Sequence, residues 1–243
     1  MSNYVRSAAF AASRVLAAQG LTVKRSHLSE VIAALLGYRT HAALSVEEAD
    51  PKLDYHLEDA EILVLNLPMG ERRAAELGLA AAGAAPSAVT TACVEALKAS
   101  AGSTDVYVSV GDFYDLHARQ ALAEMIYNAD DVAGAMAESN ASFPDEPDMD
   151  IECPPTTDLW AAVDEWTIEA DGTMTGEYDP EGDRMFNGDM LNCRGWLIYR
   201  KAGRAGLVFI EGDGTGGADD SWRDLDRDDE WAYQQSLGSN PAN

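Results

Sequence analysis

The sequence predicts an α+β fold, and three patterns carry that prediction. The first 50 residues place apolar side chains at helical spacing, the middle of the chain alternates short apolar runs with helical segments, and the last third alternates apolar with polar residues. We therefore expect an N-terminal three-helix module, a mixed α/β middle layer and a C-terminal antiparallel sheet of about four strands, followed by an acidic tail.

The helical module is expected over residues 1–50. Residues 4–19 have the pattern of an amphipathic helix. The next helix is predicted to start at Ser26, a residue type that caps helix N-termini, and to end at Gly37. A third short helix should begin at Thr40. A module of this size buries little surface, so we expect it to pack on the rest of the chain.

This module resembles a small N-terminal helical module of bacterial proteins labelled as glyoxalase-superfamily-associated, which also recurs in uncharacterised plasmid and phage-type proteins. The resemblance rests on an Ala-rich helix, a Gly, a Ser-started helix containing Glu30 and Ile32–Ala33, and the segments Leu36–Arg39 and Ala43–Leu44. Thr40–His41 stands where such modules often carry a Trp. The resemblance implies this architecture and a mobile-element origin. No glyoxalase metal pattern follows, so it implies no catalytic residue.

Residues 55–140 are expected to form the α/β middle region. The predicted elements are a buried strand at 61–67, helices at 71–82 and 87–99, a second strand at 105–110, and helices at 112–128 and 130–139. Residues 77–94 are uncharged, but Ala, Gly, Ser and Thr dominate them and Pro86 interrupts them, so a soluble helix pair is favoured over a membrane span. Neither strand is followed by a Gly-rich phosphate loop, so the sequence gives no support to nucleotide binding.

The C-terminal half begins with residues 141–158, in which four prolines among acidic residues predict a linker. An antiparallel β region is expected over 159–212. It should contain one hairpin that turns at Asp171–Gly172 and a second that turns within 201–206. Residues 213–243 are predicted to be an acidic tail, flexible at first and helical around its two tryptophans.

Charge distribution is the most informative property of the sequence. The formal net charge is -25, and residues 99–183 hold 21 acidic residues against one basic residue, Arg119. This excess argues against direct binding of nucleic acid or an anionic membrane, and it favours a basic protein as partner. The predicted partner-binding residues are Asp130, Asp131, Glu138, Asp145, Glu146, Asp148, Asp150, Glu152, Asp164, Glu165, Glu169, Glu177, Asp179, Glu181 and Asp183.

These observations favour a non-enzymatic interaction protein, encoded by a mobile element, that binds a nucleic-acid-handling protein and inhibits it, as anti-CRISPR and anti-restriction proteins do. Duplex DNA carries one charge per about 1.7 Å of axis, so twenty carboxylates correspond to about 34 Å of duplex, and DNA mimicry is one form of the hypothesis. The three cysteines are widely spaced and odd in number, which indicates a reducing cytoplasm. An acidic surface adapted to a high-salt cytoplasm is a simpler interpretation of the same charge, but such an adaptation should affect every exposed face, and the nearly neutral first 50 residues argue against it.

Other functions stay open at this point. The leading alternative is a metal-dependent or small-molecule-binding, enzyme-like domain with a site between the middle layer and the C-terminal sheet. Calcium could bind Asp179, Glu181 and Asp183, or Asp213, Asp219 and Asp220, and the candidates for catalysis are Asp112, Asp115, His117, His56 and Cys153. None of these sets has EF-hand, zinc or nucleophile spacing, so we predict no cofactor, no metal and no catalytic residue. A structural subunit that makes contact through Trp222 and Trp231 is a third possibility.

Overall fold

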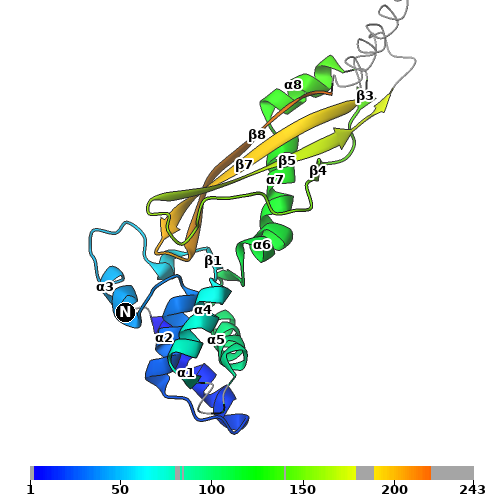
Figure 1. Cartoon of the computed structure of the whole chain (residues 1–243). Coiled ribbons are helices and arrows are strands. Elements are labelled where there is room, and N and C mark those ends of the chain that lie inside the picture. The colour runs from blue at the N-terminus through cyan, green and yellow to red at the C-terminus, as the bar shows by residue number, and fades with distance from the viewer. Residues whose placement is uncertain (1–2, 80–82, 84, 140, 179–188, 220–243) are drawn as a thin grey trace, which may run out of the picture. The chain divides into compact units, whose positions relative to one another are not determined.

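The computed structural model describes residues 3–79, 83, 85–139, 141–178 and 189–219 and confirms the α+β class (Figure 1). The helices are α1 Asn3–Ala18, α2 Arg25–Leu35, α3 His41–Glu47, η1 Leu57–Asp59, α4 Leu67–Glu76, α5 Pro86–Ser100, α6 Val110–Phe113, η3 Tyr114–Ala118, α7 Arg119–Tyr127 and α8 Asp130–Glu138. The strands are β1 Ile62–Val64, β2 Asp105–Tyr107, β3 Ala141–Ser142, β4 Asp148–Met149, β5 Glu165–Thr175, β6 Glu177–Tyr178, β7 Met190–Ala202 and β8 Gly206–Ala218.

The chain divides into two compact units, each assembled from separate segments. Unit 1 consists of residues 1–119, 151–169 and 197–212, and unit 2 of residues 120–150, 170–196 and 213–243. The long strands β5, β7 and β8 therefore contribute residues to both units.

Six strands form one mixed sheet in the order β2-β1-β8-β7-β5-β4. β1 pairs with β2 in parallel and with β8 in the antiparallel direction, whereas β4 and β5 are antiparallel. β3 and β6 form a separate antiparallel pair. The turn predicted within 201–206 is confirmed, because it joins β7 to β8.

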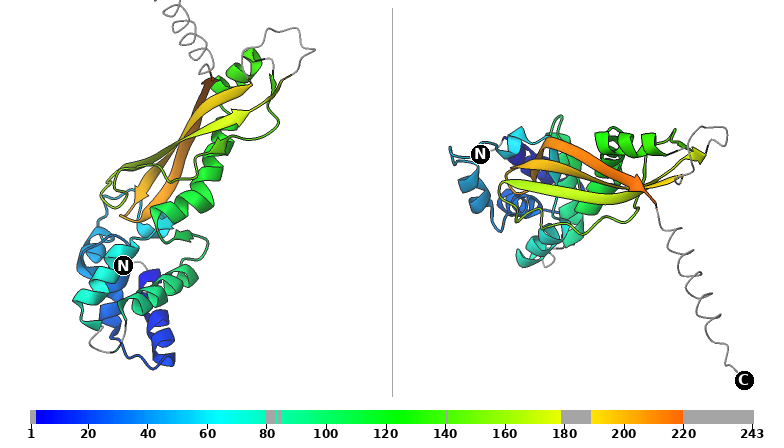
Figure 2. Two further views of the ribbon diagram at one scale, coloured as in Figure 1. Left: turned by 45° about the vertical axis from the view of Figure 1, so that its right-hand side comes forward. Right: turned by 90° about the horizontal axis from the view of Figure 1, so that it is seen from above.

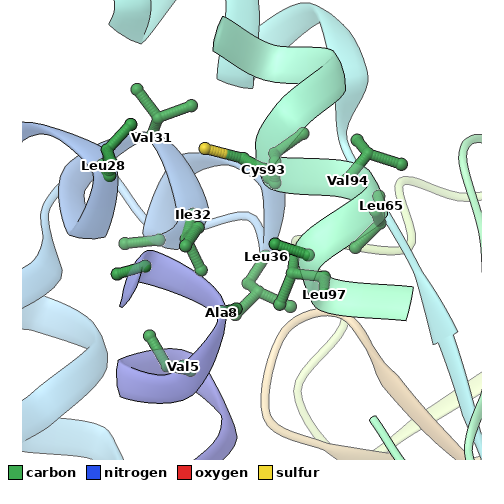
Figure 3. Packing of buried hydrophobic residues seen from close by; sticks show 14 of the residues in the cluster. Val5, Ala8, Leu28, Val31, Ile32, Leu36, Leu65, Cys93, Val94 and Leu97 are labelled. Atoms are coloured by element: carbon green, nitrogen blue, oxygen red, sulfur yellow. The ribbon is translucent and has the colours of Figure 1, made fainter. Parts of the chain in front are cut away.

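Unit 1 is built on a helical core. In Figure 1, α1 packs against α2 and α5, and α4 packs against α2 and α5. Figure 3 shows how the buried side chains of Val5, Leu28, Ile32, Leu36 and Leu97 meet there. Apolar burial of this kind contributes about 25 cal/mol per Å² of buried surface, so this cluster stabilises unit 1.

The predicted ends of the N-terminal helices are largely correct. Gly37 follows α2 with a φ of 83°, a conformation that favours glycine, and the Thr40 hydroxyl accepts a hydrogen bond of 3.1 Å from the Ala43 N–H at the start of α3. The start of α2 differs from the prediction, since Lys24 rather than Ser26 is the N-cap residue. Ser26 instead lies inside the first turn of the helix.

The predicted strand at 61–67 is shorter than expected because a helix begins at its end. The Asn66 side chain accepts a hydrogen bond of 3.0 Å from the Met69 N–H, and Pro68 occupies the first turn of α4. These two residues end β1 at Val64 and start α4 at Leu67. In the described ranges no helix has the length and apolar character needed to cross a membrane.

The hairpin predicted at Asp171–Gly172 is wrong. Residues 165–175 form one uninterrupted strand, β5. The glycine in it allows a neighbouring strand to come close. A Cβ at Gly172 would lie 2.8 Å from the Met149 sulfur and 3.0 Å from the Asp148 carbonyl oxygen, in the paired strand β4. The segment predicted as a linker thus supplies an edge strand that requires glycine opposite it.

The glycine-rich start of the predicted tail is also not flexible, because it continues β8 to Ala218. In unit 2, α7 and α8 lie along one face of β7 and β8 (Figure 2). A Cβ at Gly214 would lie 2.7 Å from the Ile126 Cα, and one at Gly216 would lie 3.1 Å from a Val132 methyl group. These glycines let both helices pack close to the strand. The helix predicted around Trp222 and Trp231 lies outside the described residues.

Candidate functional site

The predicted partner-binding acids divide between the two units. Unit 2 holds Asp130, Asp131, Glu138, Asp145, Glu146, Asp148, Asp150 and Glu177, and unit 1 holds Glu152, Asp164, Glu165 and Glu169. All twelve of these side chains are exposed. Asp179, Glu181 and Asp183 lie outside the described residues.

The described residues of unit 2 carry a large excess of negative charge. Its described residues include thirteen carboxylates and a single cationic side chain, Arg194. Arg194 lies 4.0 Å from Asp171, a distance at which an exposed ion pair contributes little. Among the described residues of this unit, carboxylates therefore outnumber cationic side chains thirteen to one. We name its exposed acids the anionic surface of unit 2.

One part of the anionic surface is a hollow beside α8. Asp130, Asp131 and Glu138 line it together with the glycines of β8, and its volume is about 340 Å³. Asp130 and Asp131 occupy the first turn of α8, where the helix dipole stabilises negative charge. The helix thus holds carboxylates that have no cation beside them in the hollow.

A second part lies at the edge formed by β4 and β5. Asp148 is paired with Thr173 across the two strands, and the Asp150 N–H donates a 3.0 Å hydrogen bond to the Asp171 carbonyl oxygen. This pairing places three exposed acids, Asp148, Asp150 and Asp171, on neighbouring backbone positions. The structure therefore brings together residues that are more than twenty positions apart in the sequence.

Comparison with family models, with curated proteins and with solved structures finds no match to this chain.

The residues weighed for catalysis do not assemble into a catalytic group in the described structure. Asp112 takes part in the N-terminal capping of the short helix α6. Its N–H donates to the hydroxyl of the N-cap residue Ser109 at 3.0 Å, and its carboxylate accepts from the Val108 N–H at 2.9 Å. His117 packs against the rings of Tyr107 and Phe113 at 6.1 and 5.4 Å, and burial lowers its pKa. Asp115 is exposed on the one-turn π-helix η3.

The remaining candidates are Cys153 and His56. The Cys153 thiol contacts the Pro154 carbonyl oxygen at 3.7 Å. Burial raises the pKa of this thiol, and the negative charge of Asp115 raises it further. A raised thiol pKa disfavours the reactive thiolate. His56 precedes η1, where its N–H donates to the Asp59 carboxylate at 2.8 Å.

The ranges that the structure describes contain no cluster of side chains suited to bind a metal ion. No group of three or more His, Cys, Asp or Glu side chains is arranged there to hold an ion. Of the acids weighed for calcium, Asp213 and Asp219 are described on β8 and just after it, whereas Asp179, Glu181, Asp183 and Asp220 are not described.

Sequence reasoning missed a cavity in unit 1 that is lined by Trp160 and Lys201. Its volume is about 570 Å³, within the range of small-molecule sites. Lys201 has only 6% of its surface exposed, which is unusual for a lysine. The sequence placed Lys201 in a hairpin turn, where lysines are normally solvated, and only the packing of distant segments buries it.

Proposed function

We propose that this chain is a non-enzymatic interaction protein that uses the anionic surface of unit 2 to occupy the basic site of another protein. The observation that carries the proposal is the ratio of thirteen carboxylates to one cation in the described part of that unit. A local excess of carboxylates over cations attracts cationic surfaces, steers their approach and makes association strongly dependent on salt.

The proposed target is a protein that handles nucleic acid, and the proposed effect is inhibition through DNA mimicry, as in anti-CRISPR or anti-restriction factors. Thirteen charges correspond to about 22 Å of duplex axis at one charge per 1.7 Å. The described part of unit 2 thus carries as many negative charges as a duplex of this length, but it can present them as the duplex does only if they lie along one face. The variants below test whether these charges act together.

We further propose that the protein acts in the cytoplasm and is encoded by a mobile element. The three cysteines support the first point, since Cys93, Cys153 and Cys193 are all free thiols. The resemblance of the N-terminal module to plasmid and phage-type proteins supports the second.

The test compares two variants of the full chain that each remove five charges. The first replaces Asp130, Asp131, Asp145 and Asp148 by Asn and Glu138 by Gln, all on unit 2. The matched control replaces Glu58, Glu71, Glu95 and Glu211 by Gln and Asp105 by Asn, all exposed on unit 1. Each immobilised protein captures partners from a bacterial lysate at low and raised NaCl, and duplex DNA is then added as competitor.

We expect the native chain and the unit 1 control to retain a basic nucleic-acid-binding protein at low salt and to release it to DNA. The unit 2 variant should retain at least tenfold less of this protein, because each lost phosphate-like contact removes part of the electrostatic affinity. Equal loss in both variants, or retention that DNA does not displace, contradicts the proposal.

A further inference from the structure

The cavity of unit 1 gathers positive charge in a chain that otherwise has little. Four basic residues, Lys52, Arg200, Lys201 and Arg204, line it, although the whole sequence contains only 17. The cavity is bounded by the β7–β8 turn, the segment that follows α3 and the segment that precedes β5. All of its lining residues belong to unit 1, and its basic side chains distinguish it from the anionic surface of unit 2.

Lys201 presents the least solvated of these cations. Its Nζ donates a hydrogen bond of 2.8 Å to the Arg204 carbonyl oxygen across the hairpin turn. That carbonyl is its single acceptor, and it forms no ion pair, among the residues that the structure describes. Two N–H donors of the ammonium group are therefore available to a ligand in the cavity.

The two acids whose charges act on Lys201 already bind other groups. One Glu47 oxygen accepts from the Tyr38 hydroxyl at 2.7 Å, and the other lies 3.7 Å from Arg204. The Arg204 guanidinium also stacks on the Tyr38 ring, 5.3 Å from its centroid. The Asp158 carboxylate accepts from the Trp160 N–H at 3.0 Å. Glu47 and Asp158 act on Lys201 only at longer range.

The cavity also has a rigid aromatic wall. The Trp160 indole donates to the Val64 carbonyl oxygen at 3.0 Å, and its ring packs on Gly37, where a Cβ would lie 2.8 Å away. Tyr55 and Val163 also line the cavity, and 38% and 81% of their respective surfaces are exposed to solvent. A flat apolar group can lie against this wall without rearranging it.

We propose that this cavity binds a small organic carboxylate with a flat apolar body, whose carboxylate accepts hydrogen bonds from Lys201. The cavity favours a single negative charge over a phosphate dianion because Asp54 and Asp164 also line it, together with Glu47. Arg200 is already paired with Glu165 at 3.1 Å, and Lys52 is exposed to solvent. Lys201 is therefore the principal buried anchor for a carboxylate.

The affinity should depend on pH in a defined direction. Burial lowers the pKa of Lys201 to about 7 in the free protein, opposed by the charges of Glu47 and Asp158. The carboxylate binds the protonated amine, so affinity falls as pH rises above this pKa. Between pH 6 and pH 8 the protonated fraction drops about tenfold, and binding should weaken by the same factor.

The experiment follows the side-chain NMR signals of selectively labelled lysine in the full chain, which contains only four lysines. Benzoate and indole-3-carboxylate are the probes, benzamide is the neutral isostere of benzoate, and phenyl phosphate is the dianion arm. We expect saturable shifts of the Lys201 signal with both carboxylates, little effect of benzamide, and about tenfold weaker binding at pH 8 than at pH 6.

Two variants separate binding from folding. Lys201→Met keeps the apolar stem and should weaken benzoate binding about 10- to 100-fold, as expected for a charge-assisted hydrogen bond. Val163→Asp adds a negative charge to the exposed rim and should also weaken binding, whereas Ile151→Asp, 77% exposed and outside the cavity, should not.

Three results overturn the proposal: no saturable shift of Lys201 with either carboxylate, equal binding of benzamide, or unchanged binding in Val163→Asp. Tighter binding of phenyl phosphate than of benzoate overturns the assignment to a carboxylate. None of these outcomes depends on capture of a basic protein by unit 2, so the two proposals fail separately.

Discussion

The two units of the chain differ in their balance of acidic and basic residues. The described part of unit 1 contains twenty acidic and thirteen basic residues, and several of them pair, as in Arg73 with Glu30 at 2.7 Å. The described part of unit 2 contains thirteen acidic residues and only Arg194 as a base. In the described residues, unit 1 therefore has a basic residue available for most of its acids, whereas unit 2 has one base for thirteen acids.

Their interiors differ as well. Unit 1 is filled by large aliphatic side chains of α1, α2 and α5, whereas in unit 2 the contacts of α7 and α8 with the sheet are made over glycines. One chain with an overall excess of negative charge thus contains two units whose interiors are packed differently. Each prediction below tests one side of this contrast.

Truncating the helical core of unit 1 should have the largest effect. Ile32 is fully buried in the cluster of Figure 3, so Ile32→Ala should lower the free energy of unfolding by about 2–5 kcal/mol. Urea unfolding followed by circular dichroism measures this. Val15→Ala, at an α1 position that is 46% exposed, is the control and should cost less than about 0.5 kcal/mol. Equal costs would contradict the assignment of the core.

Filling the glycine contact of unit 2 should have the next largest effect. Gly214→Ala places a methyl group 2.7 Å from the Ile126 backbone, which must shift, and we expect a loss of about 1–3 kcal/mol in the same measurement. Gly217→Ala, on the same strand, has no atom within 4 Å of the new methyl group and should be nearly neutral. Tolerance of the Gly214 change would show that α7 does not pack as described.

Lys201 links the stability of unit 1 to pH. Its pKa is about 7 in the folded chain and near 10.5 when unfolded, so the unfolded chain binds more protons between these values and stability rises with pH there. From pH 7 to pH 8.5 the native chain should gain about 1.5 kcal/mol relative to Lys201→Met. Unfolding curves of both proteins at each pH give the difference. A constant difference would mean that Lys201 is well solvated.

Salt should affect the two units unequally, with the smallest expected magnitude. Raising NaCl screens the repulsion among the carboxylates of unit 2, which should strengthen hydrogen-exchange protection there by less than about 1 kcal/mol. The paired charges of unit 1 should gain less or even lose slightly. Hydrogen exchange read by mass spectrometry compares both units in one sample, and uniform protection changes would count against the contrast.

The fold class and the first three helices could be predicted because local patterns determine them. The periodic apolar residues of α2, the cap at Thr40 and the positive φ of Gly37 are all local features. Glycines elsewhere misled the prediction. Gly172 and Gly214 look like turn and tail residues in the sequence, yet both are needed where two segments come close. A sequence does not distinguish a glycine that turns the chain from one that admits a neighbour.

The candidate sites depend even more on tertiary structure. The acidic residues of the middle segment were found from the sequence, but their division between two units follows from the path of β5, β7 and β8. Lys201 was missed because its burial comes from the segments around Trp160 and Glu47, which are distant in sequence.

The most direct test of the central claim is zero-length cross-linking of the full chain to its captured basic partner with a carbodiimide, which joins carboxylates to amines. Mass spectrometry then identifies the carboxylates that were joined. We predict cross-links at Asp130, Asp131, Glu138, Asp145 and Asp148 on the anionic surface of unit 2, and none at Glu58 or Glu71 of unit 1. Cross-links confined to unit 1 would contradict the account.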